Sequence, residues 1–117
     1  MGDELRGSAA GEAEAHALED LVTELDRCLE ELTQARERAG HLLRERRSGR
    51  PWLDIVTGED RPLVVERIST VLASLATTGH AWRREQALAL QRENVSINRI
   101  AAMFGVTRQR ISALLKE

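Results

Sequence analysis

The feature that most constrains the fold of this chain is a run of twenty residues, SINRIAAMFGVTRQRISALL, at positions 96–115. Its opening serine can accept a hydrogen bond from a free amide at the start of a helix over residues 97–104. Gly105 can adopt the left-handed backbone conformation that ends one helix and redirects the chain. Thr107 is another good N-cap, so a second helix is expected over residues 108–116.

The apolar residues of this run agree with two short helices joined by a tight turn. Ile100 and Phe104 lie four apart on the first helix, and Ile111 and Leu114 lie three apart on the second. These are the spacings of a single helical face. The small Ala101 allows the two helices to approach each other. The pattern predicts a helix–turn–helix, the unit with which many proteins contact DNA.

The second helix of this motif carries polar and basic side chains outside its apolar face. Arginine can form two hydrogen bonds with a guanine edge, and glutamine can do the same with adenine. We therefore expect base contacts from Thr107, Arg108, Gln109, Arg110 and Ser112. Phosphate contacts are expected from Arg83, Arg84, Arg99 and Lys116. The alternative is that these residues form the solvated face of an ordinary three-helix core.

Two resemblances support the DNA-binding interpretation. The segment VTRQRIS is similar to the promoter-reading helix of sigma factors of the sigma-70 class. Over residues 50–117, a Pro-Trp turn, an RPLVVE helix and a WRREQALAL helix precede the motif, and this order resembles small actinobacterial helix–turn–helix proteins. The second resemblance implies that residues 50–117 form an effector module, preceded by an arm where some relatives have a sensory domain. It implies no ligand.

The charge of the chain is divided along its length. Residues 1–47 have a net charge of −5, whereas residues 80–117 carry seven basic and three acidic side chains, a net charge of +4. The positive part coincides with the predicted DNA-binding motif, as phosphate binding requires. The acidic part is repelled by the DNA backbone, so we expect it to project away from a bound duplex.

Residues 13–47 are expected to form one long amphipathic helix, because they contain no proline and are rich in strong helix formers. Its apolar residues alternate at steps of four and three, a heptad pattern. The predicted seam consists of Leu18, Val22, Leu25, Leu29, Leu32 and Leu43. A lone helix of this length cannot bury such a stripe. Either two chains pair through it as a homodimer, or it folds back on the carboxy-terminal half; we favour the homodimer because that half is small.

A second apolar row lies beside the seam and consists of Leu21, Cys28, Ala35 and Leu42. The apolar face is therefore wider than a two-stranded coiled coil requires, and it suits more than one neighbouring helix. Cys28 is the single cysteine and is expected to be a small apolar filler. A chain with one thiol forms no internal disulfide, which fits a reducing cytoplasm.

The remaining segments divide at proline, glycine and small polar residues. We expect a frayed amino terminus over residues 1–12 and a connector over residues 48–60. The connector should contain one short turn, PWLDIV, with Trp52, Ile55 and Val56 packed inward. A central core helix is expected over residues 61–79, begun by Asp60 with Pro62 in its first turn and ended by Gly79. Residues 80–117 complete a three-helix unit without a β-hairpin wing.

Several classes of function are disfavoured by what the sequence lacks. The three histidines fall in different segments, and no glycine-rich phosphate loop is present. We expect no catalytic site, metal or cofactor. No apolar run is long enough to span a bilayer and no secretory signal is present, so a cytoplasmic, nucleoid-associated location is expected.

The expected protein is all-α, with a long amino-terminal amphipathic helix, a central helix and a carboxy-terminal helix–turn–helix. Its expected function is sequence-specific binding of double-stranded DNA as a dimeric bacterial transcriptional regulator. The alternative is a protein–protein adaptor whose acidic coiled arm binds a sigma factor, a polymerase or a sensor.

Overall fold

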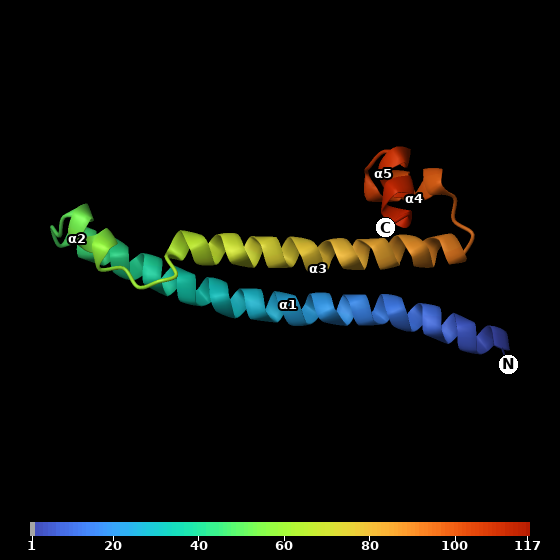
Figure 1. Cartoon of the computed structure of the whole chain (residues 1–117), viewed down its shortest axis with the longest axis horizontal. Coiled ribbons are helices and arrows are strands. Elements are labelled where there is room, and N and C mark those ends of the chain that lie inside the picture. The colour runs from blue at the N-terminus through green and yellow to red at the C-terminus, as the bar shows by residue number, and fades with distance from the viewer. Residues whose placement is uncertain (1) are drawn as a thin grey trace. The chain divides into compact units, whose positions relative to one another are not determined.

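The structure, a computed structural model, is all-α, as the sequence predicts. Its helices are α1 (Gly2–Arg47), α2 (Trp52–Thr57), α3 (Val64–Arg92), α4 (Ile97–Phe104) and α5 (Arg108–Leu115) (Figure 1). The structure describes residues 12–117 with their side chains, and residues 2–11 only as part of α1. The predicted fraying of residues 1–12 falls almost wholly outside the described side chains and stays a prediction. No helix of the described residues combines the length and the apolar character needed to cross a membrane.

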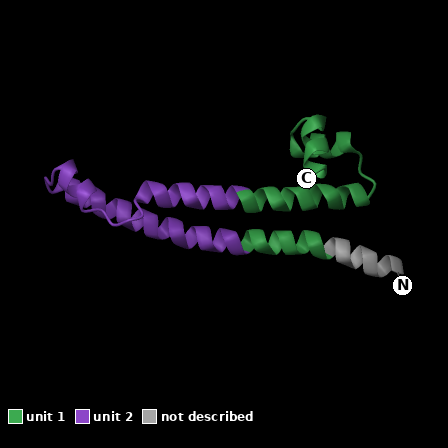
Figure 2. Cartoon of the chain, viewed as in Figure 1, with its two compact units in different colours: residues 1–22, 77–117 green, residues 23–76 purple. Residues whose placement is uncertain are grey.

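The chain divides into two compact units (Figure 2). The hairpin unit consists of residues 23–76, and the terminal unit consists of residues 1–22 with residues 77–117. Helices α1 and α3 each contribute residues to both units, whereas α2 belongs to the hairpin unit and α4 and α5 to the terminal unit.

The end of α1 and the start of α2 follow from local chemistry. α1 ends at Arg47, and Gly49 then adopts a φ of 98°, which a glycine tolerates without strain. Pro51 precedes α2 with a φ of −63°, and its carbonyl accepts a hydrogen bond from the Ile55 amide. These are the stop and turn residues that the sequence indicates in this segment.

Only part of the packing predicted for α2 is confirmed. Ile55 is buried, but Trp52 and Val56 are more than half exposed, so the prediction that these two pack inward is wrong. A six-residue helix turns one narrow side toward its neighbours, and Ile55 occupies it. Trp52 instead lies against the guanidinium of Arg46, 5.5 Å from the ring centroid, in a cation–π contact.

The start of α3 differs from the prediction that Asp60 caps it and Pro62 lies in its first turn. The helix begins at Val64, whose amide donates to the Glu59 carboxylate at 2.9 Å. A proline disfavours the helical conformation in the residue before it. The segment around Pro62 therefore stays outside the helix, and the carboxylate of Glu59, rather than that of Asp60, accepts the hydrogen bond from the first amide of α3.

The predicted break at Gly79 is also wrong, because α3 is continuous from Val64 to Arg92. A glycine inside a helix costs about 1 kcal/mol relative to alanine, which packing on either side of it can outweigh. The predicted central helix and the first helix of the predicted DNA-binding unit are thus one helix. The division between the two compact units lies within this helix, between Ala76 and Thr77.

Within the hairpin unit, α1 and α3 run antiparallel. As the residue number increases along α1, the residue number of its hydrogen-bond partner on α3 decreases. The pairs between the helices are Ser74 with Glu24, Arg27 with Ser74, and Arg67 with Gln34. Further along α1, Arg38 donates to the carbonyls of Asp60 and Pro62 in the segment just before α3. The arm therefore folds back on its own chain, the less favoured of the two predicted arrangements.

The row of α1 that is buried in this hairpin is the second row, not the predicted seam. Cys28 and Ala35 are 2% and 4% exposed, and Val71 on α3 is 3% exposed. Small side chains let two helices approach closely. All members of the predicted seam stay exposed by 40–64%: Leu18, Val22, Leu25, Leu29, Leu32 and Leu43.

Polar groups next to this contact have shifted pKa values. The hydrogen bond from Arg27, with a second from Ser74, lowers the pKa of Glu24 from 4.5 to about 2. Burial, with the neighbouring Glu24 carboxylate, raises the pKa of the Cys28 thiol. The thiol is therefore protonated at neutral pH, which agrees with the predicted role of Cys28 as a small apolar filler.

The Glu24 carboxylate makes the stability of the hairpin unit dependent on acid. Its pKa is lower in the folded chain, so its contribution is complete above about pH 4.5 and is lost as the pH falls toward about 2. We expect Glu24→Gln to lower the free energy of unfolding at pH 7 and to differ progressively less from the wild type as the pH falls through this range. Denaturant titrations at pH 7, 4 and 2.5 measure this difference.

Glu30→Gln is the matched control for this prediction. Glu30 is an exposed carboxylate on the same helix and has no hydrogen bond or ion pair among the described residues. Its replacement should leave the free energy of unfolding nearly unchanged at each pH. If the free energies of unfolding of the wild type and Glu24→Gln differed by the same amount at pH 7 and pH 2.5, the link between Glu24 ionisation and stability would be contradicted.

Candidate nucleic-acid interface

The two short helices of the terminal unit begin and end where the sequence predicts. The Ser96 hydroxyl accepts from the Arg99 amide and caps α4, and the Thr107 hydroxyl accepts from the Arg110 amide and caps α5, both at 3.2 Å. Gly105 lies between the helices with a φ of 69° in the left-handed region. These caps and this turn confirm the predicted local structure.

The turn from α3 into α4 depends on a residue that the sequence analysis missed. Asn94 has a φ of 66°, and the amide of Val95 donates to the Leu90 carbonyl at 3.0 Å. Asparagine is the residue other than glycine that most readily adopts the left-handed conformation after a helix. An asparagine two residues before a serine cap was therefore a usable signal for this turn.

The core of the terminal unit holds α5 against α3 and α4. Its buried members are Ala87, Ile100, Ala101, Ile111 and Leu114, and partly buried apolar residues such as Phe104 and Val106 surround them. Ala101 is 5% exposed, as expected for a small residue where two helices meet. This packing fixes which side of α5 faces solvent.

The predicted base-reading residues differ in their availability. Arg108, Gln109 and Arg110 are exposed, and their side chains have no hydrogen bond or ion pair among the described residues. The Thr107 hydroxyl is occupied as the cap of α5. Ser112 is half-buried. The structure thus leaves three free polar side chains in the first turn of α5.

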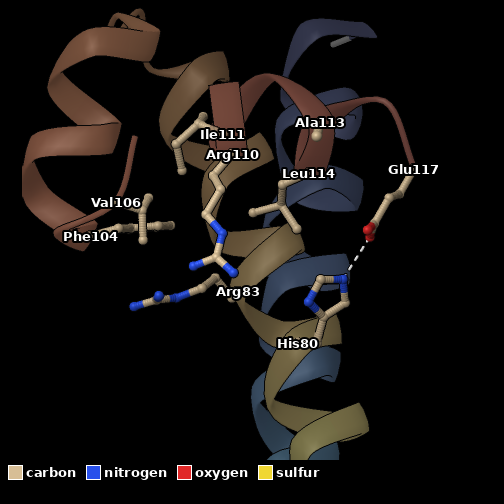
Figure 3. A pocket seen from close by; sticks show the side chains of 9 residues that line it. All are labelled: His80, Arg83, Phe104, Val106, Arg110, Ile111, Ala113, Leu114 and Glu117. Atoms are coloured by element: carbon tan, nitrogen blue, oxygen red, sulfur yellow. Dashed lines mark hydrogen bonds and ion pairs between the residues drawn. The ribbon is translucent and has the colours of Figure 1, made fainter. Parts of the chain in front are cut away.

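A shallow hollow of about 360 Å³ lies beside α5 and receives two arginine side chains (Figure 3). Arg110 reaches into it from α5, toward Arg83 on α3 (Figure 3). The Arg83 guanidinium lies over the Phe104 ring, 4.7 Å from its centroid. Neither arginine has a carboxylate partner among the described residues. Two unneutralised guanidinium groups in one hollow are suited to a shared anion such as a phosphate.

Arg84 has a different environment from the one expected of a phosphate contact. It is half-buried, and its guanidinium donates to the Glu117 carbonyl and to the Glu85 carboxylate. The Glu117 carboxylate also pairs with His80 at 2.7 Å (Figure 3). Arg84 therefore holds the end of α5 against α3 through its two terminal guanidinium nitrogens, while its buried Nε has no hydrogen-bond partner.

The helix ends add to the positive potential of this surface. Arg99 and Lys116, the remaining predicted phosphate contacts, are exposed and unpaired among the described residues. Neither α4 nor α5 has an acidic residue in its first turn, and α5 begins with Arg108. A cation at the positive end of a helix is unfavourable by about 0.3–1 kcal/mol. An anion bound there relieves this repulsion.

No group of three or more histidine, cysteine, aspartate or glutamate side chains in the described part of the chain is placed to hold a metal ion. Comparison of the chain with protein-family models, with curated proteins and with solved structures finds no match. The function proposed below therefore depends on the geometry and charge of the terminal unit.

Proposed function

We propose that this protein is a sequence-specific, double-stranded DNA-binding transcriptional regulator that acts as a dimer in the bacterial cytoplasm. The observation that carries the proposal is the exposed first turn of α5, where Arg108 and Gln109 have no partner among the described residues. An α-helix fits the major groove, where arginine recognises guanine and glutamine recognises adenine. In this proposal α5 enters the major groove with these two side chains toward the bases.

The surrounding cations take the phosphate contacts. Arg83 and Arg110 share one hollow and bind the same stretch of backbone, and Arg99 and Lys116 bind phosphates at the start of α4 and the end of α5. Arg110 thereby moves from base recognition to phosphate binding, and Arg84 has no contact with DNA.

Selection of binding sites from random duplex DNA with the full-length protein tests this proposal. We expect enrichment of one motif, read as two inverted half-sites about 10 base pairs apart or a multiple of that, because a symmetric dimer contacts symmetric half-sites. An unenriched pool, together with no retention of any duplex at low salt, would refute the proposal. Enrichment of a single, unrepeated half-site would support DNA recognition but contradict the dimer.

The adaptor function is a second candidate, because one observation favours it. The exposed apolar seam of α1 is accompanied by acidic side chains in residues 23–33, a surface that suits a basic, apolar protein partner. The arm is packed on α3, so the test uses the full chain rather than residues 1–47. Purified RNA polymerase holoenzyme and core should co-elute with the chain in size-exclusion chromatography if this function holds. Sequence-specific DNA binding without co-elution rejects it.

A further inference from the structure

The hairpin unit has an apolar side that no described residue covers, here termed the lateral face. Its six apolar side chains are exposed by 40–69%: Leu25, Leu29, Leu32 and Leu43 on α1, and Val65 and Leu72 on α3. We infer that the lateral face binds the lateral face of a second copy, with the two α1 helices antiparallel, to form a four-helix bundle. The inference deepens the dimeric part of the proposed function and is independent of DNA binding.

The lateral residues of both helices lie on one side of the hairpin. On α1, Leu29 and Leu32 follow the buried Cys28 by one and four residues. On α3, Leu72 follows the buried Val71 by one residue. Residues one and four after a buried position are rotated to the same side of a helix. Because α1 and α3 run antiparallel, that rotation brings both sets to the same side of the pair.

The extent of the lateral face is close to what a second copy needs. Residues 25–43 of α1 span about 28 Å and residues 64–76 of α3 about 20 Å at 1.5 Å per residue, and each helix is about 10 Å wide. Such a patch has a projected area of roughly 500 Å², so a pair of copies buries about 1,000 Å², the lower end for a specific interface. Two hairpins packed by such faces form a four-helix bundle, a common arrangement of amphipathic helices.

The charge pattern of α1 favours a second copy as the partner of the lateral face, and it favours an antiparallel arrangement of the two α1 helices. Residues 23–33 carry four acidic side chains and one basic, a net charge of −3, whereas residues 34–47 carry five basic and two acidic, a net charge of +3. Antiparallel α1 helices place each half against the opposite charge of the other copy. Parallel helices would place like charges together. They would also place Arg36, which lies in the leucine row, opposite Arg36 of the second copy. The surface is thus self-complementary in one direction only.

The first test removes the apolar contact. Leu29→Lys changes a side chain that is 64% exposed, so the fold of a single chain should persist, as circular dichroism can verify. We expect the wild-type chain to be a dimer in sedimentation equilibrium and the variant to be a monomer at the same concentration. Met103→Lys, at a 59% exposed apolar residue of α4, is the matched control and should remain a dimer. A monomeric wild type at 100 μM, or a variant that dimerises like the wild type, overturns the inference.

The second test determines direction by the sign of a charge effect. Asp26, Glu30, Arg44 and Arg47 are exposed residues of α1 without an ion pair among the described residues. The double variant Asp26→Lys/Glu30→Lys should weaken an antiparallel dimer about tenfold at low salt, because its acidic half becomes basic and faces the basic half of the other copy. Adding Arg44→Glu and Arg47→Glu gives the two halves net charges of opposite sign again, so it should recover part of the lost affinity.

A parallel dimer gives the opposite result in this test, because the double variant relieves repulsion between two acidic halves and tightens the dimer. Tightening, or no restoration in the fourfold variant, overturns the antiparallel arrangement. These variants leave α5 unchanged, so binding to a duplex with a single half-site is a separate measurement. Loss of dimerisation with intact half-site binding, and the reverse, therefore distinguish failure of the pairing surface from failure of the DNA-binding proposal.

Discussion

Replacing Ile100 by alanine is expected to lower the free energy of unfolding of the terminal unit by about 2–5 kcal/mol, because the substitution leaves a cavity in a close-packed core. Ile100 lies on α4 and is fully buried, in one cluster with Ala87 of α3 and Ile111 of α5. A small unit has a total stability of about 5–15 kcal/mol, so the loss is a large fraction of it. DNA retention should fall with the folded population, since Ile100 belongs to the buried cluster that packs α5 against α3 and α4.

Hydrogen exchange of the α4 and α5 amides is the appropriate measurement, because the chain consists of two compact units and one global transition is not assured. Met103→Ala is the matched control on the same helix. Its side chain is 59% exposed, and the change should alter the free energy of opening by no more than about 0.5 kcal/mol. Equal loss of protection in the two variants would show that the assigned core does not stabilise α4 and α5.

The parts of the fold that the sequence predicts correctly are those decided within a few residues. The caps at Ser96 and Thr107 each use an amide three residues ahead, and the left-handed turn at Gly105 depends on that residue's own backbone freedom. The small Ala101 in the α4–α5 contact follows from the same local pattern. Interactions of this range depend little on the rest of the molecule, so composition and spacing suffice to find them.

The errors occur where a distant segment decides between local alternatives. α1 has two apolar rows, and α3 selects the row with the small Cys28 and Ala35, which permits close approach, over the bulkier leucine row. Gly79 is a competent helix end in isolation, but α3 continues through it to Arg92. Small residues spaced seven apart, as at positions 28 and 35, were a usable signal for the buried row.

The candidate interface was predictable in its location but not in the use of each side chain. The net charge of residues 80–117 and the α5 face identify the surface, yet Arg83 and Arg84 are adjacent in sequence and have different roles in the structure. Arg83 lies over Phe104 and is free to bind an anion, whereas Arg84 is bonded to Glu117. Contacts between residues about twenty or more positions apart determine this difference, and spacing alone does not report them.

The DNA-binding proposal predicts that alanine substitution of two arginines in the first turn of α5 lowers the affinity for DNA in two distinguishable ways. Arg108→Ala should weaken binding to the selected duplex by about 1–3 kcal/mol, roughly 5- to 150-fold, and leave binding to a scrambled duplex nearly unchanged, because a base contact carries sequence information. Arg110→Ala should weaken both duplexes alike and reduce the slope of log affinity against log salt by about one, because its hollow with Arg83 binds phosphate. Fluorescence anisotropy over a range of salt concentrations measures both.

The control for these two variants must remove the same charge from another part of the chain. Arg61→Ala does so, since Arg61 lies in the connector before α3, is highly exposed and pairs with Glu66. If net charge alone governed affinity, all three variants would lose affinity equally on both duplexes, and α5 would have no reading role. If Arg108→Ala loses affinity only on the selected duplex while Arg110→Ala loses it on both, one turn of α5 performs two functions. The position of Arg108 then supplies specificity, and the hollow behind it supplies the attraction that every DNA sequence shares.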